Sequence, residues 1–135
     1  MALDEIRNIR LQKLKKIGKA FPIESQRDAS VSEVLSAWGK FAKKKKATSI
    51  CGRVMAIRGQ GALIFVDLDD GTGKIQGLLK KGAISDEEAK KFEELVDRGD
   101  FLEVSGTFFV TKRGEKTIEV KSWRMLAKSL RPLPE

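Results

Sequence analysis

The sequence predicts a mainly β protein, in which a five-stranded Greek-key barrel has one helix between its third and fourth strands and further helices before its first strand. Two observations support this fold class. After residue 47, apolar residues alternate with other residues in short runs, the period of half-buried strands, and glycine-containing turns separate the runs. The runs follow the order of three strands, a helix and two strands. At 135 residues and 41% hydrophobic content, the chain can bury one core of modest size.

The charge of the chain is unevenly distributed. The formal net charge is +8, of which residues 1–46 carry +7 and residues 47–135 carry +1. This balance favours a polyanionic partner, and the first third of the chain is expected to supply most of the attraction. The single cysteine, Cys51, excludes an internal disulfide and a cysteine-rich zinc site, which indicates a reducing compartment. We therefore expect a cytoplasmic protein.

The composition argues against several classes of function. Histidine is absent, which excludes Ser-His and Cys-His nucleophiles, histidine general bases and most catalytic zinc sites. No window approaches the ~18–20 apolar residues of a membrane span, and the N-terminus lacks the apolar segment of a signal peptide. We expect no membrane insertion and no catalysis by this chain.

Residues 1–46 are predicted to form a basic helical extension. Apolar residues at helical spacing over residues 3–17, followed by Gly18 as a C-terminal cap, predict an amphipathic helix. Its other face carries four basic residues that either contact phosphates or are solvated, and the solvated interpretation is favoured. These residues are Arg7, Arg10, Lys13 and Lys16. Residues 19–29, with Pro22, are expected to form a connector.

A second short helix is predicted before the first strand. Ser30 and Glu33 have capping-box spacing, and four apolar residues mark one face of the helix, which Gly39 ends or loosens. The apolar residues are Val31, Val34, Leu35 and Trp38. The lysine run Lys43, Lys44, Lys45 and Lys46 follows, and such runs are usually solvated. At best, we expect this run to attract phosphates without specificity.

Residues 47–128 are predicted to form the barrel. The expected strands span residues 47–58, 62–68, 74 onward, 100–111 and 116–126, with turns at 58–61, 69–73 and 112–115. Ser85 and Glu88 have capping-box spacing, and they begin a helix that is expected to end at Gly99. This order is that of the OB-fold, which binds oligonucleotides across its second and third strands.

The apolar phase predicts which way the second and third strands face. The apolar set is Ile64, Val66, Leu68, Ile75, Gly77 and Leu79, and the second set is Phe65, Asp67, Lys74 and Gln76. If Asp70-Gly71 forms a two-residue turn, Phe65 pairs with Gln76. A four-residue loop changes the pairing and preserves the facing, whereas a one-residue slip places Gln76 on the apolar face beside Val66. Phe65 and Gln76 are therefore expected on the outer surface.

This outer pair predicts a nucleic-acid site. An exposed phenylalanine offers a platform for a stacked base, and a glutamine amide offers a donor and an acceptor for a base edge. Arg58, in the first turn, and Arg113, in the last, are expected to flank the groove. Two alternatives stay open at this point: Phe65 is a core residue if the phase is inverted, and Gln76 taken alone is an ordinary surface amide.

Several segments together resemble the N-terminal anticodon-binding domain of bacterial-type class II lysyl-tRNA synthetases. The residues that carry the resemblance are Gly52 to Arg58, Phe65 with Leu68 and Asp70, Lys74 to Gln76, Arg98 to Asp100, Gly114 with Glu115, and Lys128 to Glu135. The resemblance spans nearly the whole chain, and the closing Leu-Arg-Pro-Leu-Pro run is more typical of lysyl than of aspartyl or asparaginyl enzymes. Residues 129–135 then resemble the start of a linker to a catalytic domain, whose motifs this sequence does not contain.

The resemblance implies that the chain binds the anticodon loop of lysine tRNA, which is rich in uridine. In that family an aromatic residue of the second strand stacks on the central uridine and a glutamine of the third strand hydrogen-bonds a uridine; the matching positions are Phe65 and Gln76. The arginine that ends the first strand matches Arg58, and the acidic residue that helps to read the third base matches Glu115. We expect contacts to the RNA backbone from Arg53, Lys74, Arg113 and the run Lys43, Lys44, Lys45 and Lys46.

The resemblance also implies properties of a parent enzyme. ATP and magnesium would act in its catalytic domain, where lysine is joined to tRNA through lysyl-adenylate, and this chain is expected to hold no cofactor. The parent is expected to be a homodimer and the isolated domain a monomer. The alternatives are a free-standing OB-fold protein that binds single strands, and a structural module in which Phe65 serves a protein interface.

The sequence departs from the family pattern in three places. Asp69 stands where the family commonly has glutamine, which adds negative charge at the rim of the groove. Gly77 replaces an apolar residue and is expected to loosen the third strand. The connector from Ser25 to Ser30 lacks the usual Phe-x-Arg-Thr pattern, so the contacts near the N-terminal helices are less well defined than the anticodon pocket.

Overall fold

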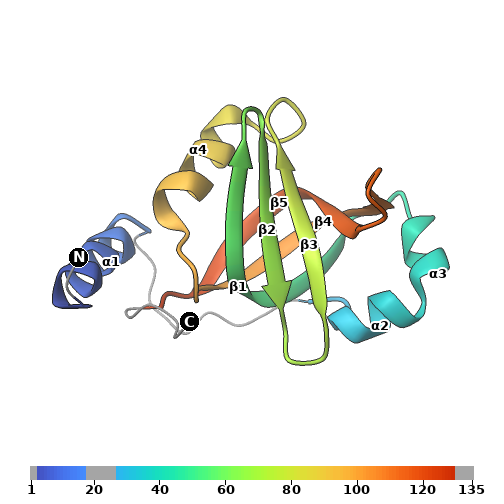
Figure 1. Ribbon diagram of the computed structural model, residues 1–135, viewed down its shortest axis with the longest axis horizontal. Coiled ribbons are helices and arrows are strands. Elements are labelled where there is room, and N and C mark those ends of the chain that lie inside the picture. The colour runs from blue at the N-terminus through green and yellow to red at the C-terminus, as the bar shows by residue number, and fades with distance from the viewer. Residues whose placement is uncertain (1–2, 18–26, 130–135) are drawn as a thin grey trace.

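The computed structural model describes residues 3–17 and 27–129, and the second of these ranges contains a closed barrel of five strands. The strands are β1 (Thr48–Gln60), β2 (Leu63–Asp69), β3 (Lys74–Lys80), β4 (Phe101–Val110) and β5 (Lys116–Ala127). The helices are α1 (Leu3–Ile17), α2 (Val31–Ser36), α3 (Trp38–Ala42) and α4 (Asp86–Leu95), of which α4 lies between β3 and β4 (Figure 1). The predicted fold class is confirmed.

The barrel closes in the order β1-β2-β3-β5-β4. Neighbouring strands are antiparallel except β3 and β5, which pair in parallel. Strand β1 has two partners along its length, because residues 48–53 pair with β4 and residues 53–60 pair with β2. A bulge between Ser105 and Gly106 bends the β4–β5 ladder. A Cβ at Gly106 would overlap the carbonyl oxygen of Glu119, so only glycine fits there.

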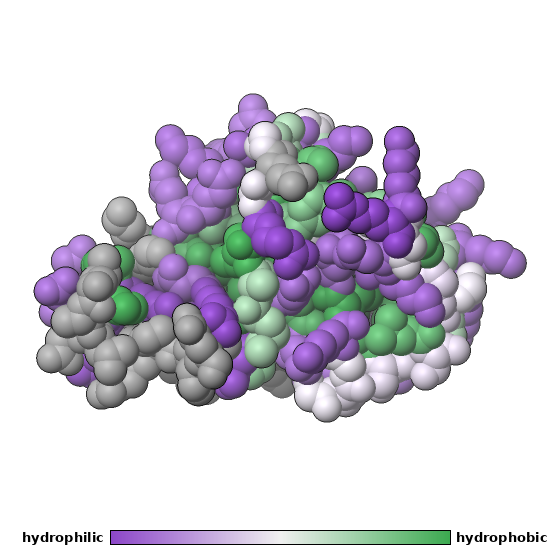
Figure 2. Space-filling model, viewed as in Figure 1, coloured by the Kyte–Doolittle hydropathy of each residue, from purple (hydrophilic) through white to green (hydrophobic). Residues whose placement is uncertain are grey.

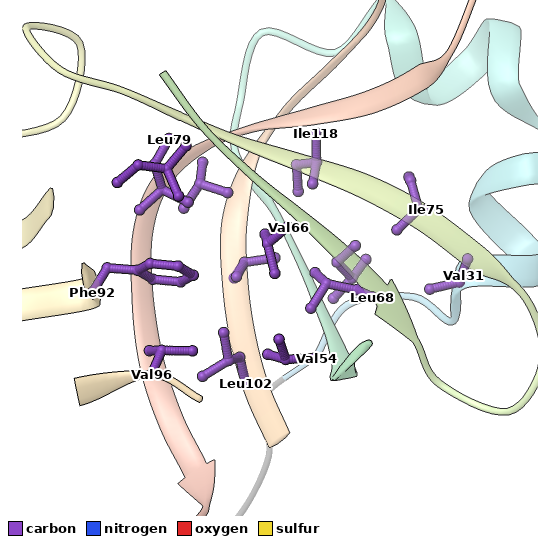
Figure 3. Close-up of a cluster of buried hydrophobic side chains, with 14 of the residues drawn as sticks. Val31, Val54, Val66, Leu68, Ile75, Leu79, Phe92, Val96, Leu102 and Ile118 are labelled. Carbon is purple, nitrogen blue, oxygen red and sulfur yellow. The ribbon is translucent and has the colours of Figure 1, made fainter. Parts of the chain in front are cut away.

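Side chains from all five strands fill the barrel, and two helices close its ends. Phe92 of α4 enters the core at one end and Val31 of α2 covers the other (Figure 3). Both side chains are fully buried, and burial of such a side chain contributes about 1.5–3 kcal/mol. The whole predicted apolar set of β2 and β3 is buried, which confirms the phase assignment.

The pairing predicted from a two-residue turn between β2 and β3 is wrong, whereas the predicted facing is confirmed. The observed pairs include Asp69 with Lys74, Asp67 with Gln76, and Phe65 with Leu78. A four-residue loop, residues 70–73, therefore joins the strands. Its geometry is set by Asp70, whose Oδ1 accepts the backbone N–H groups of Thr72 and Gly73 at 2.8 and 3.2 Å.

The turn predicted at residues 58–61 is also displaced. Strand β1 continues to Gln60, and the chain reverses at Gly61 and Ala62, where Gly61 has a φ of +59°. Arg58 therefore lies within β1, where it pairs with Phe65, rather than in a loop. The predicted turn between β4 and β5 is confirmed, and it contains Arg113 and Gly114.

The predicted starts of α2 and α4 are confirmed, and the predicted ends of these two helices are not. Ser30 and Glu33 form the complete capping box of α2, and Ser85 Oγ accepts the N–H of Glu88 at the start of α4. The helix after Ser30 breaks at Ala37 and resumes as α3, so Gly39 lies inside α3. Helix α4 ends at Leu95 rather than at Gly99, because the next residue is extended and buried in the core.

Helix α1 has the predicted bounds, but one of its basic residues is neither solvated nor free to contact a phosphate. The side chain of Arg10 is buried, and its Nη1 donates to the carbonyl oxygen of Ser129 at 3.0 Å. Its Nε also lies 3.7 Å from Asp97 Oδ2. Arg7 is exposed. The predicted cap Gly18, the Pro22 connector up to residue 26 and the closing run 130–135 lie outside the described residues.

Candidate nucleic-acid interface

The four residues assigned to base recognition line one depression on the outer surface of the barrel. Arg58 comes from β1, Phe65 from β2 and Gln76 from β3, while Glu115 comes from the β4–β5 turn. The depression has a volume of about 380 Å³, and its other lining residues are Leu63, Thr111, Lys112 and Arg113. The barrel topology thus brings together positions that are 57 residues apart at the extremes, from Arg58 to Glu115.

Phe65 faces the depression and not the core. Burial alternates along β2, with Phe65 in the half-buried phase and Ile64 and Val66 in the buried phase. On either side it pairs with Arg58 of β1 and Leu78 of β3. The alternative in which Phe65 is a core residue is therefore wrong. A half-buried aromatic ring beside a cationic side chain is typical of a platform for a planar ligand.

Gln76 is more enclosed than an ordinary surface amide, with only 8% of its area exposed. Its Oε1 accepts a hydrogen bond from Arg58 Nη2 at 3.1 Å, and its Nε2 donates to Thr117 Oγ1 at 3.1 Å. The parallel pairing of β3 with β5 places Thr117 directly beside it. The amide is therefore held from both sides at the floor of the depression.

Arg58 is fixed by a carboxylate that sequence analysis placed on the outer phase without a role. Its Nη1 and Nη2 donate to Asp67 Oδ2 and Oδ1 at 2.8 and 3.1 Å. These hydrogen bonds raise the pKa of the Arg58 guanidinium above its ordinary value. Desolvation alone would lower this pKa, and the negative charges of Asp67 and Glu115 also raise it. Because half of the Arg58 side chain is exposed, the pair orients the guanidinium and adds little stability.

A second depression, of about 330 Å³, adjoins the first and shares Gln76 and Glu115 with it. Its lining includes Lys74, a predicted backbone contact, together with Lys116 and Met55. In the space-filling view, hydrophilic side chains cover most of the β1–β2–β3 face, and apolar surface appears between them in patches (Figure 2). The two depressions together offer apolar and amide surface surrounded by charge.

Among the remaining predicted backbone contacts, Arg53 and the lysine run 43–46 lie outside both depressions. Arg53 is exposed on β1, where its guanidinium stacks over the ring of Phe101 at 4.7 Å. The lysine run 43–46 is exposed in the segment between α3 and β1, and Lys44 Nζ lies 4.6 Å from the centre of the Phe41 ring. Arg113 does line the first depression. The structure therefore groups Lys74 and Arg113 with the site and sets Arg53 and the lysine run apart from it.

Sequence analysis missed Thr117, Lys116 and Met55. Thr117 becomes visible only when β3 is paired with β5 in parallel, a long-range contact that no local pattern reports. Met55 lies at the bulge of β1 between Val54 and Ala56, where simple alternation fails. Lys116 directly follows Glu115, so the predicted position of the turn between the last two strands could have placed Lys116 near the site.

The described part of the chain lacks two other kinds of feature. Within residues 3–17 and 27–129, no group of three or more His, Cys, Asp or Glu side chains is placed to hold a metal ion. Among the helices that the structure describes, none has the length and apolar character that crossing a membrane requires.

The sequence of this chain is similar to a known family model and to several known proteins. A family model described as OB-fold nucleic acid binding domain matches residues 48–126. Lysine–tRNA ligase 2 of Methanosarcina mazei is 41% identical over 116 residues, which cover 85% of this chain and 23% of that protein. The lysine–tRNA ligase of Bacillus cereus strain AH187 is 35% identical over 137 residues, covering 98% of this chain and 26% of that protein.

A third relative, the lysine–tRNA ligase of Aquifex aeolicus, is 46% identical over 90 residues, which cover 67% of this chain and 15% of that protein. The chain thus spans about a quarter or less of the length of these relatives. The matched residues 48–126 cover all five strands of the barrel except the last residue of β5, and they include all four residues that sequence analysis assigned to base recognition. The chain belongs to the family of OB-fold nucleic acid binding domains, and it matches the N-terminal region of lysine–tRNA ligases across most of its length.

Proposed function

We propose that this domain binds the anticodon loop of lysine tRNA and reads its uridines by stacking and hydrogen bonding. The observation that carries the proposal is the convergence of Arg58, Phe65, Gln76 and Glu115 on one depression. The similarity to lysine–tRNA ligases supports the choice of RNA.

Stacking is the main source of affinity in this proposal. Phe65 presents a half-buried ring with Arg58 as its cross-strand neighbour, so an unstacked base would be held by both a ring and a guanidinium. Base–aromatic stacking contributes about 1–3 kcal/mol per base and tolerates any base. Phe65 therefore supplies affinity, and the choice among bases has to come from polar groups.

Gln76 is the polar group best placed to read a base edge. An amide oxygen has two lone pairs and an amide nitrogen has two N–H groups. Arg58 and Thr117 use one of each, which leaves one acceptor site and one donor for the ligand. The uridine edge presents an N–H donor beside a carbonyl acceptor, and this pair complements the free groups of Gln76.

Charge around the site favours the RNA backbone. Lys112 and Arg113 line the first depression and Lys74 and Lys116 line the second. Glu115 lies between them, and we propose that its carboxylate helps to read the third anticodon base. Arg53 and the lysine run 43–46 are proposed as weaker contacts to phosphates outside the two depressions.

The parent protein is proposed to be a lysine–tRNA ligase. The relatives bear this name, and this chain corresponds to a quarter or less of their length. We propose that ATP and magnesium act in a catalytic domain outside this chain, and that the chain itself holds no cofactor. The parent is proposed to be a cytoplasmic homodimer, and the isolated domain a monomer.

The proposal is tested by comparing the affinities of the domain for two RNA stem-loops that differ only in the anticodon, UUU or CCC, by calorimetry at moderate salt. Tighter binding of the UUU loop is the expected result. Equal affinity for the two loops would overturn specific reading and favour a free-standing single-strand binder. The codons that follow Glu135 in the source gene provide an independent check, because the main proposal requires a class II catalytic domain there.

A further inference from the structure

A chain of hydrogen bonds crosses four strands at the floor of the first depression. It runs from Asp67 to Arg58 at 2.8 and 3.1 Å, and from Arg58 to Gln76 at 3.1 Å. It continues from Gln76 to Thr117 at 3.1 Å, and from Thr117 Oγ1 to the carbonyl oxygen of Glu115 at 3.0 Å. The residues come from β2, β1, β3, β5 and the β4–β5 turn. Gln76 is thus the central link of a chain with partners on both sides.

The chemistry of the partners fixes the orientation of the Gln76 amide. A guanidinium has only donors, so the atom that faces Arg58 has to be the amide oxygen. The hydroxyl hydrogen of Thr117 is used by the Glu115 carbonyl, so Thr117 Oγ1 acts as an acceptor toward Gln76 Nε2. Rotation of the amide by 180° would set its N–H groups against the guanidinium and would break the bond from Thr117 to Glu115.

We propose that Asp67 and Thr117 are specificity-determining positioning residues, which hold Gln76 in the orientation that accepts uridine and rejects cytidine. The inference rests on the proposed function and assigns the discrimination to the whole hydrogen-bonded chain rather than to Gln76 alone. Neither residue was assigned a role by sequence analysis.

Orientation matters because uridine and cytidine present opposite patterns at the same atoms. Uridine has a donor at N3 and an acceptor at position 4, whereas cytidine has an acceptor at N3 and a donor at position 4. For one placement of the stacked base, an amide with its oxygen toward N3 pairs with uridine. The same amide rotated by 180° pairs with cytidine. An amide that is free to rotate therefore reads both bases, and a fixed amide reads one.

The two positioning residues act from different sides of the amide. Thr117 has no exposed surface, so it cannot touch RNA and any effect on recognition has to pass through Gln76. Asp67 acts through Arg58, whose side chain is half exposed and would otherwise be mobile. The two hydrogen bonds that Arg58 donates to Asp67 keep the guanidinium beside the amide oxygen, and so both sides of the amide are held.

The variants Thr117→Val, Asp67→Asn and their combination separate positioning from contact. The affinity of each variant is measured for pairs of stem-loops that differ only in having uridine or cytidine at a single anticodon position. We expect the double variant to lose about five- to tenfold of the uridine preference, the factor that corresponds to about one hydrogen bond. Its affinity for cytidine loops should rise relative to uridine loops, and each single variant should show part of the effect. Thr107→Val is the matched control, since Thr107 lies on β4 and lines neither depression.

Nuclear magnetic resonance of the RNA-free protein gives a second readout. In the wild type, the Nε2 protons of Gln76 should show nuclear Overhauser contacts to Thr117 and none to the guanidinium of Arg58. In the double variant, these protons should show contacts both to the side chain at position 117 and to the guanidinium of Arg58. Contacts to Arg58 in the wild type, or a wild-type uridine preference in the double variant, would overturn the inference and leave the proposed function standing. A wild type without uridine preference would overturn both.

Discussion

Lys128 Nζ lies 2.5 Å from Asp100 Oδ2, and neither side chain has any exposed surface. The ammonium also donates to Asp97 Oδ2 at 2.6 Å and to the carbonyl oxygen of Leu95 at 2.8 Å. Asp100 accepts the backbone N–H groups of Asp97 and Ser129 as well. One buried ion pair thus joins the end of α4, the start of β4 and the residue where the described chain leaves the barrel.

Lys128→Met should destabilise the domain by about 3–5 kcal/mol, because it leaves the buried carboxylate of Asp100 without its cation. Chemical denaturation of the wild type and the variant gives this difference. Adding Asp100→Asn to Lys128→Met should restore part of the loss, since a neutral amide removes the stranded charge and still accepts one backbone N–H. A double variant no more stable than Lys128→Met would contradict this account of the pair.

The lowered pKa of the Asp70 carboxyl predicts that the stability of the domain depends on pH. Burial by itself would raise the pKa of its carboxyl, but hydrogen bonds from the Thr72 side chain and from the backbone N–H groups of Val31, Thr72 and Gly73 outweigh burial and lower the pKa below the ordinary 3.8. A lowered pKa means that the carboxylate stabilises the folded state above about pH 4, and that this contribution is lost as the pH falls through the folded-state pKa.

Asp70→Asn should therefore be destabilising at neutral pH, and the difference from the wild type should narrow below about pH 4. Denaturant unfolding at several pH values measures this narrowing. A constant difference between about pH 7 and about pH 3 would show that the negative charge of Asp70 contributes nothing and that its hydrogen-bond geometry accounts for the whole effect.

Gly77 lies at a close approach between β3 and Val66 of β2, and the expected loosening of β3 stays a prediction. The residue is buried, and a Cβ there would lie 2.8 Å from Cγ1 of Val66, a stiff side chain with no exposed surface. Gly77→Ala should cost about 1–3 kcal/mol as overpacking. Gly59→Ala on β1 is the control, because no non-neighbouring atom in the described part of the chain lies within 4 Å of the position that its methyl group would take. This control should leave the melting temperature almost unchanged.

The facing of β2 and β3 was predictable because the apolar phase is a local property of each strand. The pairing was not, since it depends on loop length, and the hydrogen bonds of Asp70 to the loop and to α2 favour four loop residues over two. Phe65 could be assigned to the outer surface from alternation alone. Leu78 of β3 pairs with Phe65 and faces the same side, yet it is only 7% exposed. Alternation does not predict its burial, because the residues of β3 are buried on both faces of the strand.

The candidate site was predictable one residue at a time, whereas its hydrogen bonds were not. Resemblance and phase together pointed to Phe65 and Gln76. That the amide of Gln76 would be nearly buried depends on Thr117, which is 41 residues away in the sequence and adjacent in the barrel. Arg10 shows the same limit, because its helical pattern is that of a solvated face, and its partner Ser129 lies 119 residues away.

Phe65→Ala and Gln76→Ala should each weaken binding of a UUU stem-loop by about 1–3 kcal/mol. The first change removes a stacking platform and should weaken UUU and CCC loops alike. The second removes the polar reader and should weaken UUU loops more. Calorimetric titration measures both effects. Phe101→Ala removes an aromatic ring that lines neither depression and stacks with Arg53, a proposed weaker contact, so it should reduce the affinity much less than Phe65→Ala does. An equal loss with Phe101→Ala would show that the effect of Phe65→Ala reflects general destabilisation.

Alanine substitutions throughout the run Lys43, Lys44, Lys45 and Lys46 should lower the affinity for every RNA alike, because these lysines lie outside both depressions. The decisive measurement is the dependence of affinity on salt. Each lost phosphate contact should reduce the slope of log K against log salt by about 0.7–0.9. Lys90→Ala with Arg98→Ala removes two charges from exposed positions on and just after α4, and it controls for net charge. A slope that falls equally per charge in both variants would mean that the run acts through net charge alone, whereas a steeper fall in the lysine-run variant would place phosphates beside it.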